Sequence, residues 1–305
     1  MKKYQFTFLK TLLAIASLWT TTPKAMATDK ESTQAKADLT VFANIEQVDD
    51  GNTFGDLTLK PRVSLEKGDY KAEYLGSFYN WGYSDHTTGD WLTLMSRIRL
   101  ENSEWAAHIG RMQLRPDFVS YLKTPMTTTL DNDIMLAGTC RTFTGAHLTH
   151  KDSGLGLGIV AHDTRMSFNH WDTGLISWEK TFGSELGVAA HIGIGDKGLH
   201  NAGITTAWMP TDKTSVVLEG IYDQRTTHGI LGAHHKITDD FSVFAGIKVS
   251  KPNQGKICGW AATGISYRLG NGFSVVGAIK HDIGGRNDIH GIIGLRYAGS
   301  FEIER

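Results

Sequence analysis

Lysine and arginine residues recur at two-residue spacing in this chain. Lys60 and Arg62 form one such pair, and Arg97 and Arg99 form another. Residues two apart point to the same side of a β-strand, so each pair would place two positive charges on one face. Fixed charges of this kind attract ions and orient polar solutes in water, and they break no bonds. The pattern therefore indicates an electrostatic function rather than catalysis.

Motifs for catalysis or metal binding are not found. The chain has no HExxH, no paired CxxC and no glycine-rich phosphate loop. His234 and His235 are adjacent, so in a strand they would point to opposite faces and could not hold one metal together. His108, His147, His162, His191 and His290 share the parity of the charged residues, which leaves a metal or pH-sensing cluster open. We favour the alternative, scattered histidines without partners, and predict no catalytic residue, no metal site and no cofactor.

The charged pairs lie in segments that alternate apolar and polar residues. Around Arg62 one side carries Leu57, Leu59, Val63 and Leu65, while the other carries Thr58, Lys60, Arg62, Ser64 and Glu66. If the apolar side faces lipid, the cations face inward, because an arginine facing lipid near mid-bilayer costs about 2–4 kcal/mol. We expect the same assignment for Arg97 and Arg99. The alternation predicts a barrel with lipid outside and water inside.

Sixteen such segments follow one another with no change in composition. Short turns rich in Gly, Asn, Asp and Ser follow the even segments, and longer links follow most of the odd ones, as in outer-membrane barrels. The fold class is therefore an all-β antiparallel transmembrane β-barrel of about 16 strands, with short periplasmic turns and longer extracellular loops. Pro61 and Arg111 interrupt the pattern and require a local irregularity. The expected strands are 37–47, 54–66, 70–81, 91–101, 104–115, 134–150, 154–165, 171–182, 185–194, 200–210, 214–223, 228–237, 240–250, 256–269, 272–281 and 288–298.

The first 27 residues have the pattern of an export signal. Lys2 and Lys3 precede an apolar stretch from Phe8 to Trp19, and Ala25-Met26-Ala27 is a small-x-small cleavage site. We expect a signal peptide over 1–27, a periplasmic lead over 28–36 and the barrel over 37–305. The signal holds four of the 31 Lys and Arg residues, so the mature part has 27 against 32 acids. That acidic balance argues against nucleic-acid binding.

Two cysteines, Cys140 and Cys258, are 118 positions apart. A disulfide is compatible with an oxidising compartment. We favour two separate thiols, because the strand order places them on nearly opposite walls and a disulfide needs Cα atoms within roughly 7 Å.

As a pattern, the mature chain resembles the general diffusion porins of Gram-negative outer membranes. Those proteins have sixteen strands and a long third extracellular loop folded into the lumen, and the longest link here, from about Leu114 to Asp133, is the third outer one. The resemblance implies a water-filled channel for small hydrophilic solutes and ions in the outer-membrane lipid, and it leaves a homotrimer open. It also implies a constriction between loop acids and wall cations. Carried over by position, the acids are Asp117, Asp131 and Asp133, and the cations are Lys60, Arg62, Arg97, Arg99 and Arg141.

Other functions remain as alternatives. One is a channel specific for a sugar or phosphate, and another is a barrel whose paired charges fill a closed lumen. A barrel lipase or protease, a structural or adhesive barrel and a soluble periplasmic β protein are less favoured. The C-terminus departs from the family pattern, because four residues follow Phe301 where such barrels end on an aromatic residue.

Overall fold

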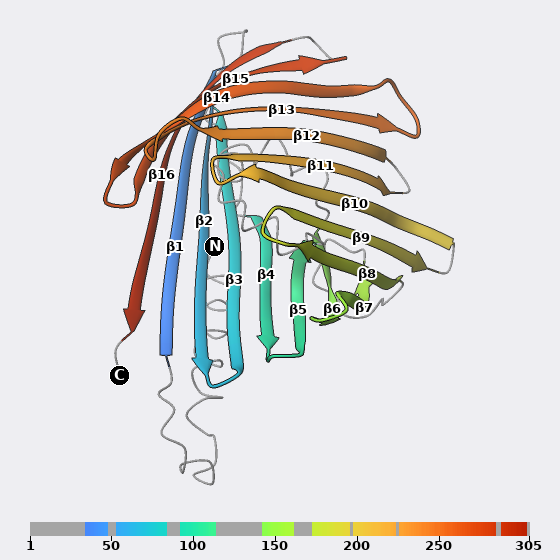
Figure 1. The fold of residues 1–305 in the computed structure, drawn as a ribbon. Helices are drawn as coiled ribbons and strands as arrows, with labels where there is room; N and C mark the ends of the chain where they lie inside the picture. Colours follow the sequence, from blue (N-terminus) through green and yellow to red (C-terminus); the bar gives the residue numbers. More distant parts are fainter. Residues whose placement is uncertain are drawn as a thin grey trace. The chain divides into compact units, whose positions relative to one another are not determined.

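The computed structural model describes residues 34–47, 53–83, 92–113, 142–161, 173–195, 198–223, 226–284 and 288–303. These residues form a closed barrel of antiparallel strands that pair in sequence order, and β1 returns beside β16 (Figure 1). Within the described part, no helix is both long and apolar enough to span a membrane.

Sixteen strands make up the barrel, which confirms the predicted fold class and strand number. Most ends lie within two or three residues of those expected, because tight turns and period-two alternation define them. The bounds are β1 Gln34–Gln47, β2 Thr53–Lys67, β3 Tyr70–Tyr83, β4 Leu92–Glu101, β5 Trp105–Gln113, β6 Thr142–His150, β7 Leu155–Ala161, β8 Thr173–Phe182, β9 Leu186–Gly195, β10 Gly198–Thr211, β11 Thr214–Asp223, β12 Thr226–Lys236, β13 Phe241–Pro252, β14 Cys258–Gly270, β15 Phe273–Ile283 and β16 Ile289–Ile303.

The first and last strands close the barrel. β1 pairs with β16 from Ala35 opposite Ile303 to Gln47 opposite Gly291. It also pairs with β2 along its whole length. Among the described strands, closure leaves no strand edge open to pairing with another chain. The last strand therefore continues through Phe301 instead of ending at residue 298, since pairing with β1 extends that far.

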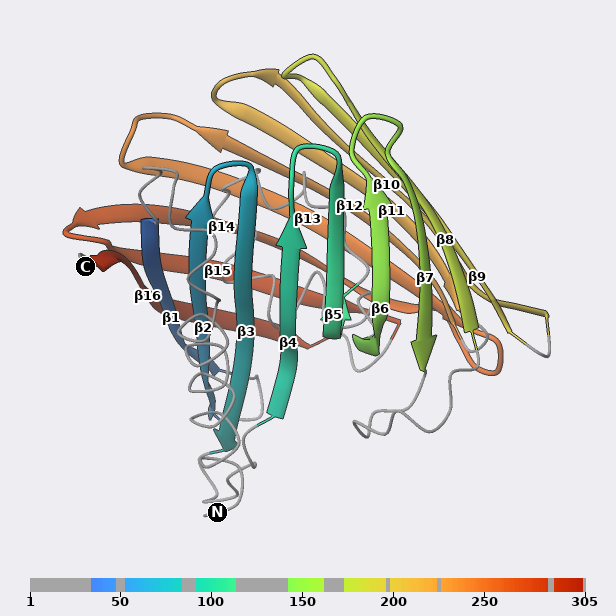
Figure 2. The same cartoon turned by 90° about the horizontal axis from the view of Figure 1, so that it is seen from below.

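Tight turns after the even strands lie at one end of the barrel, as the turns joining β2 to β3, β4 to β5 and β6 to β7 show (Figure 2). The turn between β14 and β15 holds Asn271 at φ 51°, a left-handed conformation that asparagine adopts more readily than most residues. Six of the eight links after odd strands are five residues or longer, whereas β9 to β10 and β11 to β12 are each joined by two residues. This asymmetry agrees with the one predicted from the chain.

Side chains alternate between the two faces of the wall. On β1 the inward Phe42 is 2% exposed and the outward Ile45 is 61% exposed. Inward positions of β2 hold the buried Asp56, Thr58 and Ser64. The outer face carries most of the exposed large apolar residues, among them Ile109, Leu157, Ile204, Leu218, Ile265, Ile293 and Leu295.

The two expected irregularities are both present. The β2–β3 ladder has no recorded pair at Lys60 or Pro61, and the neighbouring β3–β4 ladder shifts register between Ser77 and Phe78. Opposite the proline ring, a Cβ at Gly76 would lie 3.0 Å from Pro61 Cγ, so glycine gives the ring room. Beside Arg111, Gly110 has φ 124°, a conformation that L side chains rarely adopt.

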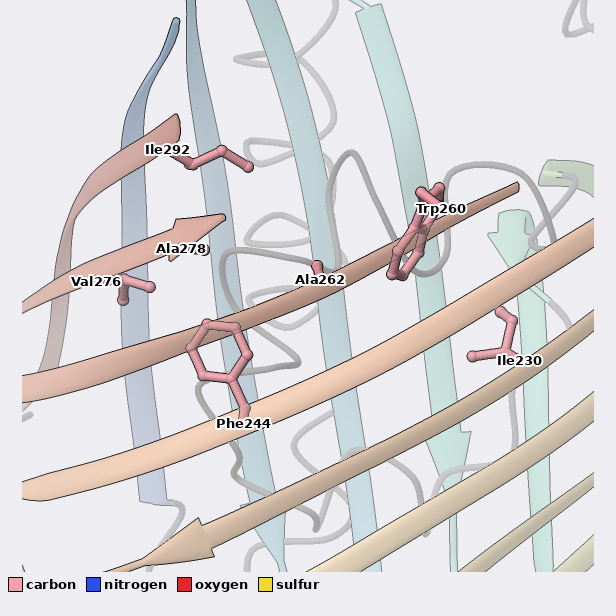
Figure 3. Close-up of a cluster of buried hydrophobic side chains, with 7 residues drawn as sticks. All are labelled: Ile230, Phe244, Trp260, Ala262, Val276, Ala278 and Ile292. Atoms are coloured by element: carbon pink, nitrogen blue, oxygen red, sulfur yellow. The ribbon is translucent and has the colours of Figure 1, made fainter. Parts of the chain in front are cut away.

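One part of the inner face is apolar. Seven buried side chains from β12 to β16 pack together on it (Figure 3). We call this cluster the apolar strip; it consists of Ile230, Phe244, Trp260, Ala262, Val276, Ala278 and Ile292. A Cβ at Gly264 would lie 2.4 Å from Phe244 Cζ, so the glycine lets the Phe244 ring lie flat along the wall.

Candidate functional site

Charged residues gather on the inner face of β2, β3 and β4. Arg62 Nε donates to Glu73 Oε1 at 2.6 Å, and the Glu73 side chain is almost fully buried. Arg99 Nη2 donates to Glu101 Oε2 at 2.7 Å, and Lys151 Nζ lies 3.1 Å from the same oxygen. Glu73 and Arg99 are direct register partners, so the two ion pairs adjoin. The wall therefore carries alternating fixed charges across neighbouring strands.

The predicted site residues fall into two groups. Arg62 and Arg99 lie in the charged cluster. Arg97 lies on β4, as Arg99 does, and is paired with Leu75 on β3 and Gly110 on β5. Lys60 Nζ lies over the Phe42 ring, 5.1 Å from its centroid. The remaining four, Arg141, Asp117, Asp131 and Asp133, lie outside the described residues, as does Cys140. Their part in a constriction stays a prediction.

Histidines form a row on the inner face of β5, β6 and β9. His108 and His147 are direct register partners with ring centroids 6.3 Å apart. His147 Nε2 lies 2.8 Å from Ser177 Oγ, and Ser177 is opposite His191. The expectation of histidines without partners is wrong for His147, because the glycines of β7 leave space for its ring to reach β8. A Cβ at Gly156 would lie 2.6 Å from His147 Nε2.

A second ionic cluster spans β1, β15 and β16. His290 Nδ1 lies 2.7 Å from Glu46 Oε1, and Lys280 Nζ lies 2.9 Å from the same oxygen. His290 Nε2 lies 3.2 Å from Asp282 Oδ2. His290 therefore also has partners, contrary to expectation. Glu46 thus contacts two bases, and His290 contacts two carboxylates.

The serine–histidine contacts suggest structure rather than catalysis. A hydroxyl beside an imidazole is the arrangement of a nucleophile and its base. However, the same contact recurs at His228 with Ser250, at 2.8 Å, and at His150 with Ser153, at 3.0 Å. His147 Nδ1 lies 3.4 Å from a threonine hydroxyl, Thr149 Oγ1, where catalytic triads place a carboxylate. The contacts of His147 with Ser177 and of His228 with Ser250 join neighbouring strands on the inner face, and that of His150 with Ser153 lies in the turn after β6. Their recurrence favours hydrogen bonds that satisfy polar groups of the sheet and its turns.

Metal-ligating side chains do not gather in threes anywhere in the described ranges. At the start of β14, Cys258 carries an exposed free thiol.

Comparison with known proteins shows which solved structures share this fold. Neither a protein-family profile nor a curated protein sequence matches the chain. Solved structures of a porin from Rhodopseudomonas blastica do match it. A multiple mutant of that porin gives a TM-score of 0.54 at 13% identity, covering 88% of this chain and 99% of the other.

Two further solved structures match to a similar degree. One, titled as a study of asymmetric conductivity of engineered proteins, gives 0.53 at 13% identity over 88% and 100% of the two chains. A double mutant of the same porin gives 0.52 at 12% identity over 88% and 99%. The chain thus has a porin-like sixteen-strand barrel fold.

Proposed function

We propose that this chain is an outer-membrane porin that forms a water-filled channel for passive diffusion of small hydrophilic solutes and ions. The observation that carries the proposal is the closed sixteen-strand barrel with a mostly polar inner face and an apolar outer face. About sixteen strands enclose an aqueous channel, whereas eight enclose a packed core. Such a channel needs no catalytic group and no cofactor.

The neck of the channel would set its selectivity. Opposed rows of fixed charge create a transverse field across a narrow aqueous passage, which orients water and polar solutes and disfavours apolar ones. The ion pairs Arg62–Glu73 and Arg99–Glu101 support one side of this arrangement. We assign the neck to Lys60, Arg62, Arg97, Arg99 and Arg141 opposite Asp117, Asp131 and Asp133.

Liposome swelling tests this function directly. Purified protein in liposomes should admit a series of uncharged sugars at rates that fall steeply with sugar size. The control is the same protein unfolded by heat before reconstitution. Liposomes that swell no faster with folded protein than with this control would rule out an open diffusion channel and favour the closed-lumen or structural barrel.

The location follows from the same proposal. Residues 1–27 would be removed on export from a Gram-negative cytoplasm, and the apolar outer face would contact outer-membrane lipid. Membrane fractionation and N-terminal sequencing of the mature protein check both points. Recovery of a water-soluble monomer without detergent would contradict them.

Assembly into a homotrimer is part of the proposal. Tyr74 and Ser96 lie at outward register positions, yet Tyr74 is buried and its Oη lies 3.3 Å from Ser96 Oγ. A polar pair on an otherwise apolar face suits contact with protein better than contact with lipid. Cross-linking of the detergent-solubilised protein should trap three copies.

A substrate-specific channel is the second candidate. The observation that favours it is the apolar strip, because a channel for purely hydrophilic solutes has no use for an apolar inner wall. Competition between solutes in single-channel recordings separates this candidate from a general porin.

A further inference from the structure

Two arginines share one row of the barrel wall. Register pairing aligns Phe42 on β1 with Arg296 on β16, Arg296 with Ser274 on β15, and Ser274 with Arg268 on β14. The side chains at these positions are on the inner face of the barrel, as are Lys60 and the residues of the apolar strip. The row therefore brings together two guanidinium groups and an aromatic ring from β14, β16 and β1, with Ser274 of β15 between the two arginines.

The two arginines of this row have no acidic partner in the part of the chain that the structure describes. Among the described residues, neither Arg268 nor Arg296 forms an ion pair, and the two arginines lie in one row with a single strand between them. Arg296 Nε is buried and has no hydrogen-bond partner within the part of the chain that the structure describes. Two unneutralised like charges and a buried free donor are suited to binding an anion.

The Phe42 ring organises a third cation. Lys60 Nζ lies 5.1 Å from the ring centroid, and Arg296 Cζ lies 5.6 Å from it. Both distances are within the range in which a ring attracts a cation. The aromatic ring thus holds Lys60 and Arg296 beside one another despite their like charge.

The apolar strip begins directly above this row. Val276 is two residues beyond Ser274 on β15, and Ala278, Ile292 and Phe244 lie in the row four residues beyond. At about 3.4 Å per residue, the strip starts roughly 7 Å from the cation row at Val276, and its Phe244 and Ile292 lie roughly 14 Å from that row. Its far end, at Trp260 and Ile230, is eight residues or about 27 Å from the row. One wall therefore offers positive charge and apolar surface at a fixed separation.

We propose that this wall is a binding site for a small amphiphilic organic anion, such as an aryl- or alkyl-substituted carboxylate. The anionic group binds at Arg268, Arg296 and Lys60, and the apolar body lies against Val276, Phe244 and Ile292. Guanidinium groups favour carboxylates because they offer paired donors in a planar fork. The site requires the folded barrel alone and does not depend on whether the barrel conducts.

Calorimetric titration of the detergent-solubilised protein tests the site. The probes are 4-phenylbutyrate, butyrate as the head group without the ring, and 4-phenylbutylamine as the ring with opposite charge. 4-Phenylbutyrate should bind with saturation, and the other two should bind at least about tenfold more weakly. Equal binding of all three would show partition into detergent and overturn the proposal.

Variants separate the two halves of the site. R268Q/R296Q should weaken 4-phenylbutyrate binding about tenfold or more, because charge-assisted hydrogen bonds are lost. The matched control is K36Q/K71Q, which also removes two inward cations. Lys36 and Lys71 are already paired with Asp38 and Glu66, so this variant should bind 4-phenylbutyrate as the wild type does. V276T and I292T should weaken 4-phenylbutyrate and leave butyrate unchanged. Heat-modifiable gel mobility shows that each variant is folded, and unchanged binding by folded R268Q/R296Q would overturn the site.

Discussion

At the scale of single residues, a buried acid on β3 positions an exposed cation on β2. Glu73 is 3% exposed, whereas nearly half of the Arg62 side chain is accessible. A buried carboxylate is stable only when it is paired and hydrogen-bonded. Glu73 therefore fixes where Arg62 presents its charge.

This arrangement predicts that two Glu→Gln substitutions, one at a buried and one at an exposed glutamate, lower the free energy of unfolding by different amounts. E73Q should lower the free energy of unfolding by about 1–3 kcal/mol, because it breaks a buried charge-assisted contact. The control is E66Q, which breaks the more exposed pair with Lys71 and should cost at most about 1 kcal/mol. Urea unfolding in lipid vesicles measures both. Equal losses would mean that Glu73 contributes no more than a surface acid.

At the scale of elements, glycine on one strand determines what its neighbours can do. β7 has Gly156 and Gly158 at inward positions, and the His147 ring from β6 lies over both of them. The sequence predicted a strand over 154–165, and both glycines do lie on a strand, β7. Parity placed His108, His147 and His191 on one face, but the contact of His147 with Ser177 was not predicted, because an opening on one strand and a ring on the next are related only through register.

Adding a methyl group tests this dependence. G156A would place a Cβ 2.4 Å from Ser177 Oγ and 2.6 Å from His147 Nε2, so one side chain must move. The expected destabilisation is about 1–3 kcal/mol, typical of overpacking. G229A on β12 is the matched control, since nothing lies within 4 Å of its Cβ. A thermal transition of G156A identical to that of G229A would contradict the account of the row.

The link between β5 and β6 is the element on which the proposed neck depends. Residues 114–141 lie outside the described structure, so their place rests on length and on the resemblance to general porins. Neutralising Asp117, Asp131 and Asp133 should move ion preference toward anions, while neutralising Arg62, Arg97 and Arg99 should move it toward cations. Reversal potentials in a salt gradient measure the shift. Preferences that do not change in either variant would place the constriction elsewhere.

At the scale of the whole molecule, alternation and turn chemistry predicted the strand number, the closed barrel and the shared face of Arg62, Arg97 and Arg99. Those features follow from local pattern. The apolar strip could not be predicted from local pattern, because several apolar residues follow one another there and no alternation shows which of them face inward. Val275 faces outward and is 36% exposed, whereas its neighbour Val276 is 1% exposed. Only the register of the closed sheet shows which of two such neighbours faces inward.

The central claim is that this barrel encloses an open aqueous passage, and single-channel recording in a planar bilayer tests it most directly. Folded protein added to a bilayer in potassium chloride should produce stepwise current increments of uniform size that rise in proportion to salt concentration. Protein unfolded by heat should produce none. A folded, membrane-inserted barrel that gives no steps above the bare-bilayer current would contradict the account.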